Sequence, residues 1–439
     1  DERVIKTSIA LQHLDNIWDR KAKGLYKNKP KQLANFYAEP IELNLGNIIS
    51  AFFDKYNVVR SDLDQIIKHK YCIDEEENVS VETMKKLNVL IVVSLDMREQ
   101  NGASNIRPAK IIEAFKKTAH NTDVIESPSR GRQRKNIVKN ILKSIYTRKK
   151  YDICYFEPSP FPIQFFERML IKWLKFRKTW ISYFHRDMYW RYDDIIESLL
   201  TYEKLKEHKI KQENNLKFLE NNIDLLFTPT KLYAEKLNST LKTVDLPPAG
   251  NLNKIDYNSE QREGVIYVGG VSKRYGTSLL LKSFERINQT HCIPLTIICR
   301  KKEVIFDDYI NYSWLTIRHL TSSQIQQFYS EFKFGVIPII KNKYHRFVLA
   351  FKLFEYASFG LPIAVSDNFE QVKLVEKNEM GLNIGDSVES FSEGIVKLYE
   401  NPKLLNEFHN NSVEFIKNKG LWKHRVATII KQYRGRNEK

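Results

Sequence analysis

The order of hydrophobic and polar positions predicts two consecutive α/β regions. Residues 87–93 form a short aliphatic, β-branched run, which is typical of a strand buried on both faces of a parallel sheet. A loop at 101–104 follows, and apolar positions then recur at helical spacing through 111–115. Strands alternating with helices predict a parallel sheet covered by helices on both faces. Further strands are predicted at 152–156, 180–184 and 223–227.

A second alternation begins after a turn-rich stretch at 246–264, which is typical of a linker between domains. Its predicted strands are 264–268, 295–299, 334–340 and 362–365, and its predicted helices are 277–288, 322–332, 349–359, 388–399, 403–417 and 422–433. We therefore expect two doubly wound, Rossmann-like domains, at 85–250 and 251–439, facing each other across a cleft. Residues 1–84 are expected to form a mainly helical appendage or the tail of a preceding domain.

Composition limits the classes of protein that this chain can be. The 439 residues carry a net charge of +17, with 42% hydrophobic and 12% aromatic residues, which excludes a disordered polycation. The positive excess requires an anionic neighbour, such as a nucleotide, a nucleic acid or an anionic membrane face. No zinc, RNA-stacking or helix-turn-helix signature accompanies the charge, so no nucleic-acid partner is expected. Four cysteines without CxxC spacing favour a reducing cytoplasm.

A glycine-rich turn at 268–276 lies between a predicted strand and a predicted helix. Gly269 and Gly270 allow backbone N–H groups to approach a pyrophosphate, and the N-terminus of the following helix favours negative charge. Lys273 and Arg274 supply cations in the same turn. The alternative interpretation is a tight strand-to-helix turn whose charges are only solvated.

A second motif, at 350–367, places Lys352 and Glu355 three residues apart on one helix face. A carboxylate there binds ribose or sugar hydroxyls, and an ammonium group neutralises phosphate. The alternative is a surface ion pair between the two side chains, worth a few tenths of a kcal/mol. Gly360 and Pro362 then end the helix and lead into a strand.

These two motifs resemble those of the nucleotide-sugar-binding half of GT-B glycosyltransferases, especially family 4. Three further segments resemble that family in the same order: 184–187 with His185 and Asp187, 222–230, and the helix that begins near Trp422. The resemblance covers about 87–433. It implies an acceptor domain at 85–250, a donor-binding domain at 251–439, and hexosyl transfer from a nucleoside diphosphate sugar to an acceptor hydroxyl without a metal or other cofactor.

The resemblance also implies roles for individual residues. Whether the enzyme is inverting or retaining stays open: an inverting enzyme needs a base, for which Asp187, Asp96 and Glu99 are candidates, whereas in a retaining enzyme His185 contacts the donor. The expected catalytic residues are His185, Asp187 and Glu355. The expected donor-binding residues are Gly269, Gly270, Lys273, Arg274, Arg300, Lys352 and Glu355. The expected acceptor loop is Gly102, Ala103 and Ser104.

Two departures from the family pattern matter. The family's pair of cations falls on Gly270 and Tyr275, so Lys273, Arg274 or Arg300 has to bind the phosphates. The first of the family's paired glutamates falls on Phe347. These departures favour one alternative, a non-catalytic, donor-binding subunit of a glycosyltransferase complex. A sugar-nucleotide epimerase, a second enzyme class on a similar fold, also stays open.

Much of the positive charge lies in the predicted acceptor half. The segment 127–150 has no acidic residue and interleaves cations with apolar residues at helical spacing, and 161–178 mixes aromatic with basic residues. Such segments suit the headgroup region of an anionic leaflet, although ordinary core stripes with solvated charges are the alternative. We expect a cytoplasmic enzyme peripherally bound to the inner membrane face, acting on a cell-surface glycan or lipid-linked acceptor in polysaccharide biosynthesis of the bacterial type. The expected membrane contacts are Arg130, Arg132, Arg134, Lys135, Lys172 and Trp173.

Overall fold

The computed structural model divides the chain into two compact units, residues 1–84 and 85–439. It describes residues 86–94, 103–118, 121–126, 149–192, 202–253, 257–271, 275–301 and 311–437, all of them in the second unit. The predicted appendage at 1–84 therefore lies outside the described residues. Among the helices that are described, none is both long and apolar enough to cross a membrane.

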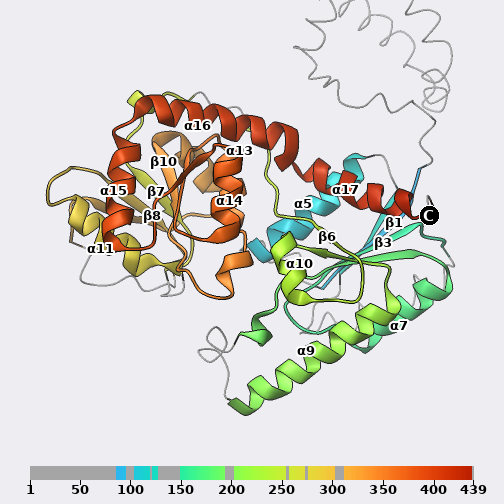
Figure 1. Ribbon diagram of the computed structural model, residues 1–439. Coiled ribbons are helices and arrows are strands. Elements are labelled where there is room, and N and C mark those ends of the chain that lie inside the picture. The colour runs from blue at the N-terminus through green and yellow to red at the C-terminus, as the bar shows by residue number, and fades with distance from the viewer. Residues whose placement is uncertain are drawn as a thin grey trace, which may run out of the picture. The chain divides into compact units, whose positions relative to one another are not determined.

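The first half of this unit is built on a six-stranded parallel sheet with the order β2-β1-β3-β4-β5-β6 (Figure 1). The strands are β1 (Asn88–Val93), β2 (Asn121–Glu126), β3 (Ile153–Glu157), β4 (Trp180–Phe184), β5 (Leu225–Thr228) and β6 (Thr243–Asp245). The connecting helices include α5 (Ala103–Lys117), α7 (Phe165–Phe176), the 3-10 turn η2 (Tyr189–Arg191), α9 (Tyr202–Asn222) and α10 (Lys231–Leu237).

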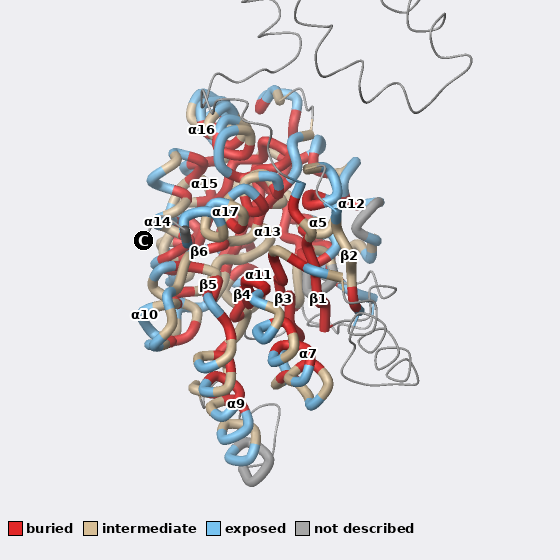
Figure 2. The backbone as a smooth tube through the Cα atoms, turned by 90° about the vertical axis from the view of Figure 1, so that its right-hand side faces the viewer, coloured by how far each residue is buried: buried red, intermediate tan, exposed pale blue. Residues whose placement is uncertain are grey.

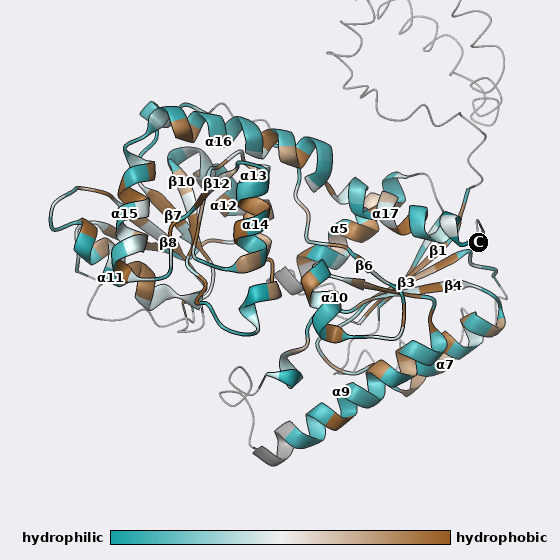
Figure 3. Cartoon of the chain, viewed as in Figure 1, coloured by the Kyte–Doolittle hydropathy of each residue, from teal (hydrophilic) through white to brown (hydrophobic). Residues whose placement is uncertain are grey.

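Alternation of side chains along β1 produces two separate cores. Val89, Ile91 and Val93 point to one face of the sheet and pack with α5, whereas Leu90 and Val92 point to the other and pack with α7, α9 and α10. Because both faces are covered, the strand has no polar face, which explains its continuous apolar sequence. The central strands are accordingly buried and strongly hydrophobic (Figures 2 and 3).

The second half repeats this architecture with the strand order β12-β11-β10-β7-β8-β9. Its strands are β7 (Val265–Val268), β8 (Leu295–Ile298), β9 (Leu315–Arg318), β10 (Phe334–Ile337), β11 (Ile363–Val365) and β12 (Gly381–Asn383). Its helices include α11 (Thr277–Ile287), α12 (Ser322–Phe328), α13 (Phe351–Ser358), α14 (Phe369–Lys377), α15 (Val388–Tyr399), α16 (Pro402–Phe415) and α17 (Trp422–Arg434). The strand order reverses between β7 and β10, and ligands of such sheets bind outside the strand ends at this switch point.

The predicted two-sheet α/β fold is confirmed, but four strands were missed. These are β2, β6, β9 and β12, and they are the four edge strands of the two sheets. All four carry exposed or half-exposed residues, so none has the apolar run that marks a central strand. Helix α14 was also missed. The sequence therefore predicts the buried centre of each sheet and not its edges.

The stretch after β6 is packed rather than extended as a free linker. Leu246 and Ala249 are buried, and the α17 residues Trp422 and Val426 belong to the same core as β1. Helix α17 is the last of the range 251–439 and yet packs against α5 of the first half (Figure 1). Near its C-terminal end the chain therefore returns to the first half and packs against it.

Arg425 of α17 holds this helix against the segment that follows β6. Its guanidinium donates to Pro247 O at 2.9 Å, Pro248 O at 2.8 Å and Lys419 O at 3.0 Å. Burial, together with the nearby charge of Arg107, lowers the pKa of Arg425 to about 9. The residue is still protonated near neutral pH and donates charge-assisted hydrogen bonds to these carbonyl groups.

Replacing Arg425 by Ala removes four charge-assisted hydrogen bonds to three backbone carbonyls, of which, within the described residues, only Pro247 O keeps another donor, Arg107. We expect the free energy of unfolding to fall by about 3 kcal/mol. Urea denaturation followed by circular dichroism measures this change. Lys423→Ala, an exposed position on the same helix, is the control and should stay within about 0.5 kcal/mol of the parent. Equal effects of the two substitutions would contradict the role given to Arg425.

Candidate functional site

His185 lies directly after β4, at the carboxyl edge of the first sheet. Its amide donates to Phe227 O at 2.7 Å, which fixes its backbone beside β5. The side chain is only 6% exposed, its Nδ1 lies 2.7 Å from the hydroxyl oxygen of Tyr233, and its ring packs on Trp190. Burial, helped by the charge of Arg191, lowers the pKa of His185 to about 3. The imidazole is therefore neutral at physiological pH and serves as a polar contact rather than a cation.

Asp187 follows two residues later and is held from the other half of the unit. The hydroxyl of Tyr344 donates to its Oδ1 at 3.2 Å. Burial raises the pKa of the Asp187 carboxyl above its ordinary value, although Arg186 and the hydroxyl groups of Tyr344 and Tyr189 oppose the shift. A raised carboxyl pKa is the property that a general base working near neutral pH needs.

Glu157, the last residue of β3, anchors this edge of the sheet and was missed in the sequence. Its fully buried carboxylate accepts hydrogen bonds from Arg107 Nε at 2.9 Å, Arg186 Nη2 at 3.2 Å and the Tyr155 hydroxyl at 2.6 Å. Arg107 of α5 also stacks over Phe184, with its Cζ 3.6 Å from the ring centroid. The network fixes the backbone that carries His185 and Asp187. Its sequence signal was an acidic residue directly after a predicted strand, the same signal that drew attention to Asp187.

The short turn η7 (His345–Phe347) of the second half is packed into the core of the first half. Phe347 is 1% exposed, and its ring centroid lies 5.5 Å from that of Tyr233 and 5.6 Å from that of Tyr192. Thr230 Oγ1 donates to the Phe347 carbonyl at 2.9 Å. The position at which family 4 enzymes have their first glutamate is therefore an apolar contact between the two halves.

The glycine-rich turn after β7 is tightly packed at the switch point of the second sheet. Gly276 has a φ of +76°, and a Cβ there would lie 1.5 Å from Pro338 O in the loop after β10. A Cβ on Gly270 would lie 2.4 Å from the ring of Tyr275, so the tyrosine covers the place where the family has cations. Gly269 donates its amide to Ile298 O at 3.0 Å. Position 276 therefore requires glycine, and α11 begins directly after it.

Lys352 and Glu355 are brought together on the first turns of α13. Lys352 Nζ donates to Glu355 Oε2, and the buried Tyr329 hydroxyl donates to Oε1 at 2.7 Å. Helix α13 is itself fixed on the sheet, because the amide of Val268 donates to the Tyr356 hydroxyl at 3.0 Å. The carboxylate is thus pre-positioned at the sheet edge by one cation and one hydroxyl, and its side chain remains 15% exposed.

The other predicted site residues are less informative. Arg300 follows β8 and is exposed, Ala103 and Ser104 form the first turn of α5, Lys172 is exposed, and Trp173 is half-buried on α7. Outside the described residues lie Gly102, Lys273, Arg274, Asp96, Glu99, Arg130, Arg132, Arg134 and Lys135. Within the described part of the chain, no group of three or more His, Cys, Asp or Glu residues is arranged to hold a metal ion.

The two parallel sheets with their flanking helices define a GT-B architecture. Its two Rossmann-like halves carry the candidate site residues at the carboxyl edges of their sheets. Residues 262–401, about a third of the chain, match the family described as glycosyl transferases group 1. The resemblance to GT-B glycosyltransferases of the family 4 type is therefore confirmed, and glycosyl transfer is the class of reaction that it supports. No curated protein matches the sequence.

Solved structures show the same fold at low sequence identity. Sucrose-phosphate synthase from Thermosynechococcus elongatus is 13% identical, with a TM-score of 0.58 over 80% of this chain and 99% of that one. HepE from Anabaena, solved in complex with UDP, is 10% identical, with a TM-score of 0.55 over 79% and 100%. WaaG, a glycosyltransferase involved in lipopolysaccharide biosynthesis, is 13% identical, with a TM-score of 0.53 over 77% and 98%.

The buried, neutral state of His185 predicts a pH dependence of stability. Its folded-state pKa of about 3 lies below the unfolded value of 6.5, so the unfolded chain takes up the proton first as the pH falls. The stability is complete above about pH 6.5 and is lost toward pH 3, by up to about 1.4 kcal/mol per pH unit from this residue.

Urea denaturation from about pH 7 to pH 4 tests this dependence in the parent and in His185→Asn, which keeps an acceptor for Tyr233. The variant should lose less stability on acidification than the parent. His291→Asn, at a partly exposed position, is the control and should follow the parent curve. Parallel curves for the parent and His185→Asn would show that His185 is not held neutral.

Proposed function

We propose that this protein transfers a hexosyl group from a nucleoside diphosphate sugar to the hydroxyl of a glycan or lipid-linked acceptor. The observation that carries the proposal is the match of residues 262–401 to group 1 glycosyl transferases, on a second half whose sheet has its switch point at the glycine-rich turn. The UDP bound in the structure of HepE supports a nucleoside diphosphate as the carrier of the sugar.

In this proposal the second half binds the donor. The Glu355 carboxylate, held by Tyr329 and Lys352, accepts hydrogen bonds from donor hydroxyls. The N–H groups at the start of α11 and the cations Lys352, Arg300, Lys273 and Arg274 stabilise the departing diphosphate. Cations and helix-terminal N–H groups can do this without a metal ion.

The first half binds the acceptor in the same proposal. Asp187 accepts the proton of the attacking hydroxyl if the reaction inverts configuration, and its raised pKa favours this role. His185, neutral and fixed by Tyr233, contacts the donor sugar in the retaining alternative. The acceptor loop at the start of α5 lies after β1, next to the switch point between β1 and β3. In this proposal the transfer reaction takes place at the inner face of the membrane.

One observation favours a second candidate, a non-catalytic donor-binding subunit. Phe347 and Tyr275 fill the positions of a glutamate and a cation of the family, and Phe347 joins the halves beside His185 and Asp187. A protein that binds a sugar nucleotide but transfers no sugar, even with a cell-lipid extract, would establish this candidate. A thermal-shift screen with UDP, GDP and their sugar conjugates measures binding, because a ligand at about 100 times its Kd stabilises the fold by roughly 2.7 kcal/mol.

Glu355→Gln tests the proposed transfer directly. The amide keeps the size of the side chain but removes the charge that Lys352 and Tyr329 hold, so we expect a loss of about 100-fold in transfer rate. Release of nucleoside diphosphate in the presence of acceptor lipid extract measures that rate. Glu376→Gln, at an exposed position of α14, is the control. Full activity in Glu355→Gln would remove Glu355 from the site.

A further inference from the structure

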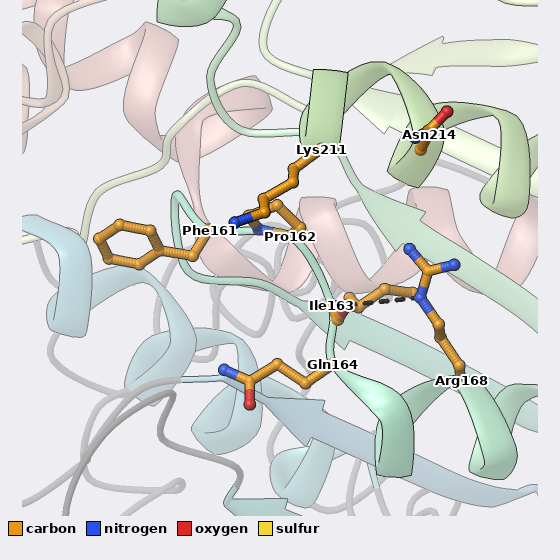
Figure 4. Close-up of a pocket in the computed structure, with 7 residues that line it drawn as sticks. All are labelled: Phe161, Pro162, Ile163, Gln164, Arg168, Lys211 and Asn214. Atoms are coloured by element: carbon orange, nitrogen blue, oxygen red, sulfur yellow. Dashed lines mark hydrogen bonds between the residues drawn. The ribbon is translucent and has the colours of Figure 1, made fainter. Parts of the chain in front are cut away.

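A cavity of about 470 Å³ lies in the first half, where the loop before α7 meets α9. It is lined by Phe161, Pro162, Ile163, Gln164, Arg168, Lys211 and Asn214 (Figure 4). Its volume falls in the range typical of small-molecule sites. Its lining contains two cations and no carboxylate, which suits an anionic group.

The cavity is preformed, because helix α9 holds the loop that leads into α7. Gln212 Nε2 donates to Pro160 O at 2.8 Å, and the amide of Ile163 donates to Asn215 Oδ1 at 3.2 Å. Arg168 is also fixed: its Nε donates to Ile163 O at 3.4 Å, and its Cζ lies 4.5 Å from the Phe218 ring centroid. Little ordering is therefore needed when a ligand enters.

Exposed apolar side chains continue from the cavity along α7. Phe165 is 66% exposed, Met169 38% and Phe176 83%, and with Lys172 they share one helix face that extends for roughly 16 Å. Of the nine exposed large hydrophobic side chains in the described part of the chain, five lie here: Phe161, Phe165, Met169, Phe176 and Ile210. A soluble phosphate compound would give these rings nothing to contact.

The exposed charges on α7, beside these rings, are positive. The only carboxylate of α7, Glu167, is buried, whereas Lys172 and Lys175 are exposed. Lys211 of the cavity forms an exposed ion pair with Glu207, one helical turn away. Such pairs contribute little to stability, so the Lys211 ammonium group can exchange this partner for a phosphate. Exposed aromatic rings combined with cations are typical of a surface that lies in the headgroup region of an anionic leaflet.

We propose that the cavity binds the phosphate group of a membrane lipid, through Arg168 and Lys211, while Phe165, Met169 and Phe176 enter the lipid interface. The inference deepens the proposed function, because it gives the acceptor half a specific lipid-binding site. Phosphate recognition positions the protein, and the α7 rings supply the apolar contact that distinguishes a lipid from a free phosphate.

Co-sedimentation with vesicles of phosphatidylcholine, with and without about one third phosphatidylglycerol, tests the site on the full chain without any donor. The double variant Arg168→Gln, Lys211→Gln should bind anionic vesicles about 30-fold more weakly, since each cation near the surface contributes roughly fivefold. The control, Lys397→Gln with Lys403→Gln, removes the same charge from exposed positions of the second half and should bind as the parent does.

Two further variants separate the cavity from general charge and from misfolding. Phe176→Ser should weaken binding about tenfold, whereas Phe369→Ser, at an exposed position of α14, should not. Glu207→Gln should strengthen binding, because it frees Lys211, and a gain cannot arise from misfolding. Unchanged binding in the cavity double variant, or weaker binding in Glu207→Gln, would overturn the proposal.

The result of the vesicle-binding experiment does not depend on the proposed transfer reaction. The UDP-induced thermal shift should be the same in all these variants and in the parent. Vesicle binding with the expected variant pattern but no sugar transfer would reject the proposed function and keep this site. Sugar transfer by a protein that does not bind anionic vesicles would reject this site and keep the proposed transfer reaction.

Discussion

The contact of η7 with the first half is the constraint on which the arrangement of the site depends. Phe347 and Tyr344 leave the second half and pack among Tyr189, Tyr192 and Tyr233, and Thr230 holds the Phe347 carbonyl. Aromatic rings at these separations add favourable edge-to-face contacts to their burial. Because Tyr233 also holds His185 and Tyr344 also holds Asp187, the contact between the halves and the positions of both candidate catalytic side chains are set by the same few rings.

This arrangement accounts for the departures from the family pattern. A glutamate at position 347 would be an acid in an apolar cluster, which is costly unless a partner neutralises it. With Phe347 there, the site keeps a single glutamate of the family's pair, Glu355, and that carboxylate is held by Tyr329 and Lys352. The donor side therefore depends on one well-positioned carboxylate, whereas the family's pattern has two.

The parts of the fold that the sequence predicted are those with local causes. Runs such as 87–93 and the helix containing Lys352 and Glu355 follow from periodicity and from spacing over a few residues. The edge strands were not predicted because half-exposed residues leave no apolar run. The contacts that hold the site were not predicted for another reason: Arg107 contacts Glu157 across 50 residues of sequence, and Thr230 contacts Phe347 across 117. Spacing along the chain carries no information about such contacts, so the motifs located the edges of the site and not what holds them.

Two kinds of cation stand out among the described residues, buried arginines and exposed lysines. Arg107, Arg262 and Arg425 are buried and bind carbonyl or carboxylate groups inside the unit, a role that suits the planar, always charged guanidinium group. These cations carry no information about a partner. The exposed lysines of α7 and α9 do indicate a partner, because they lie beside exposed phenylalanines and outnumber the carboxylates near them. The net charge alone points to an anionic neighbour, but only the separation of buried arginines from exposed lysines indicates which face of the acceptor half that neighbour contacts.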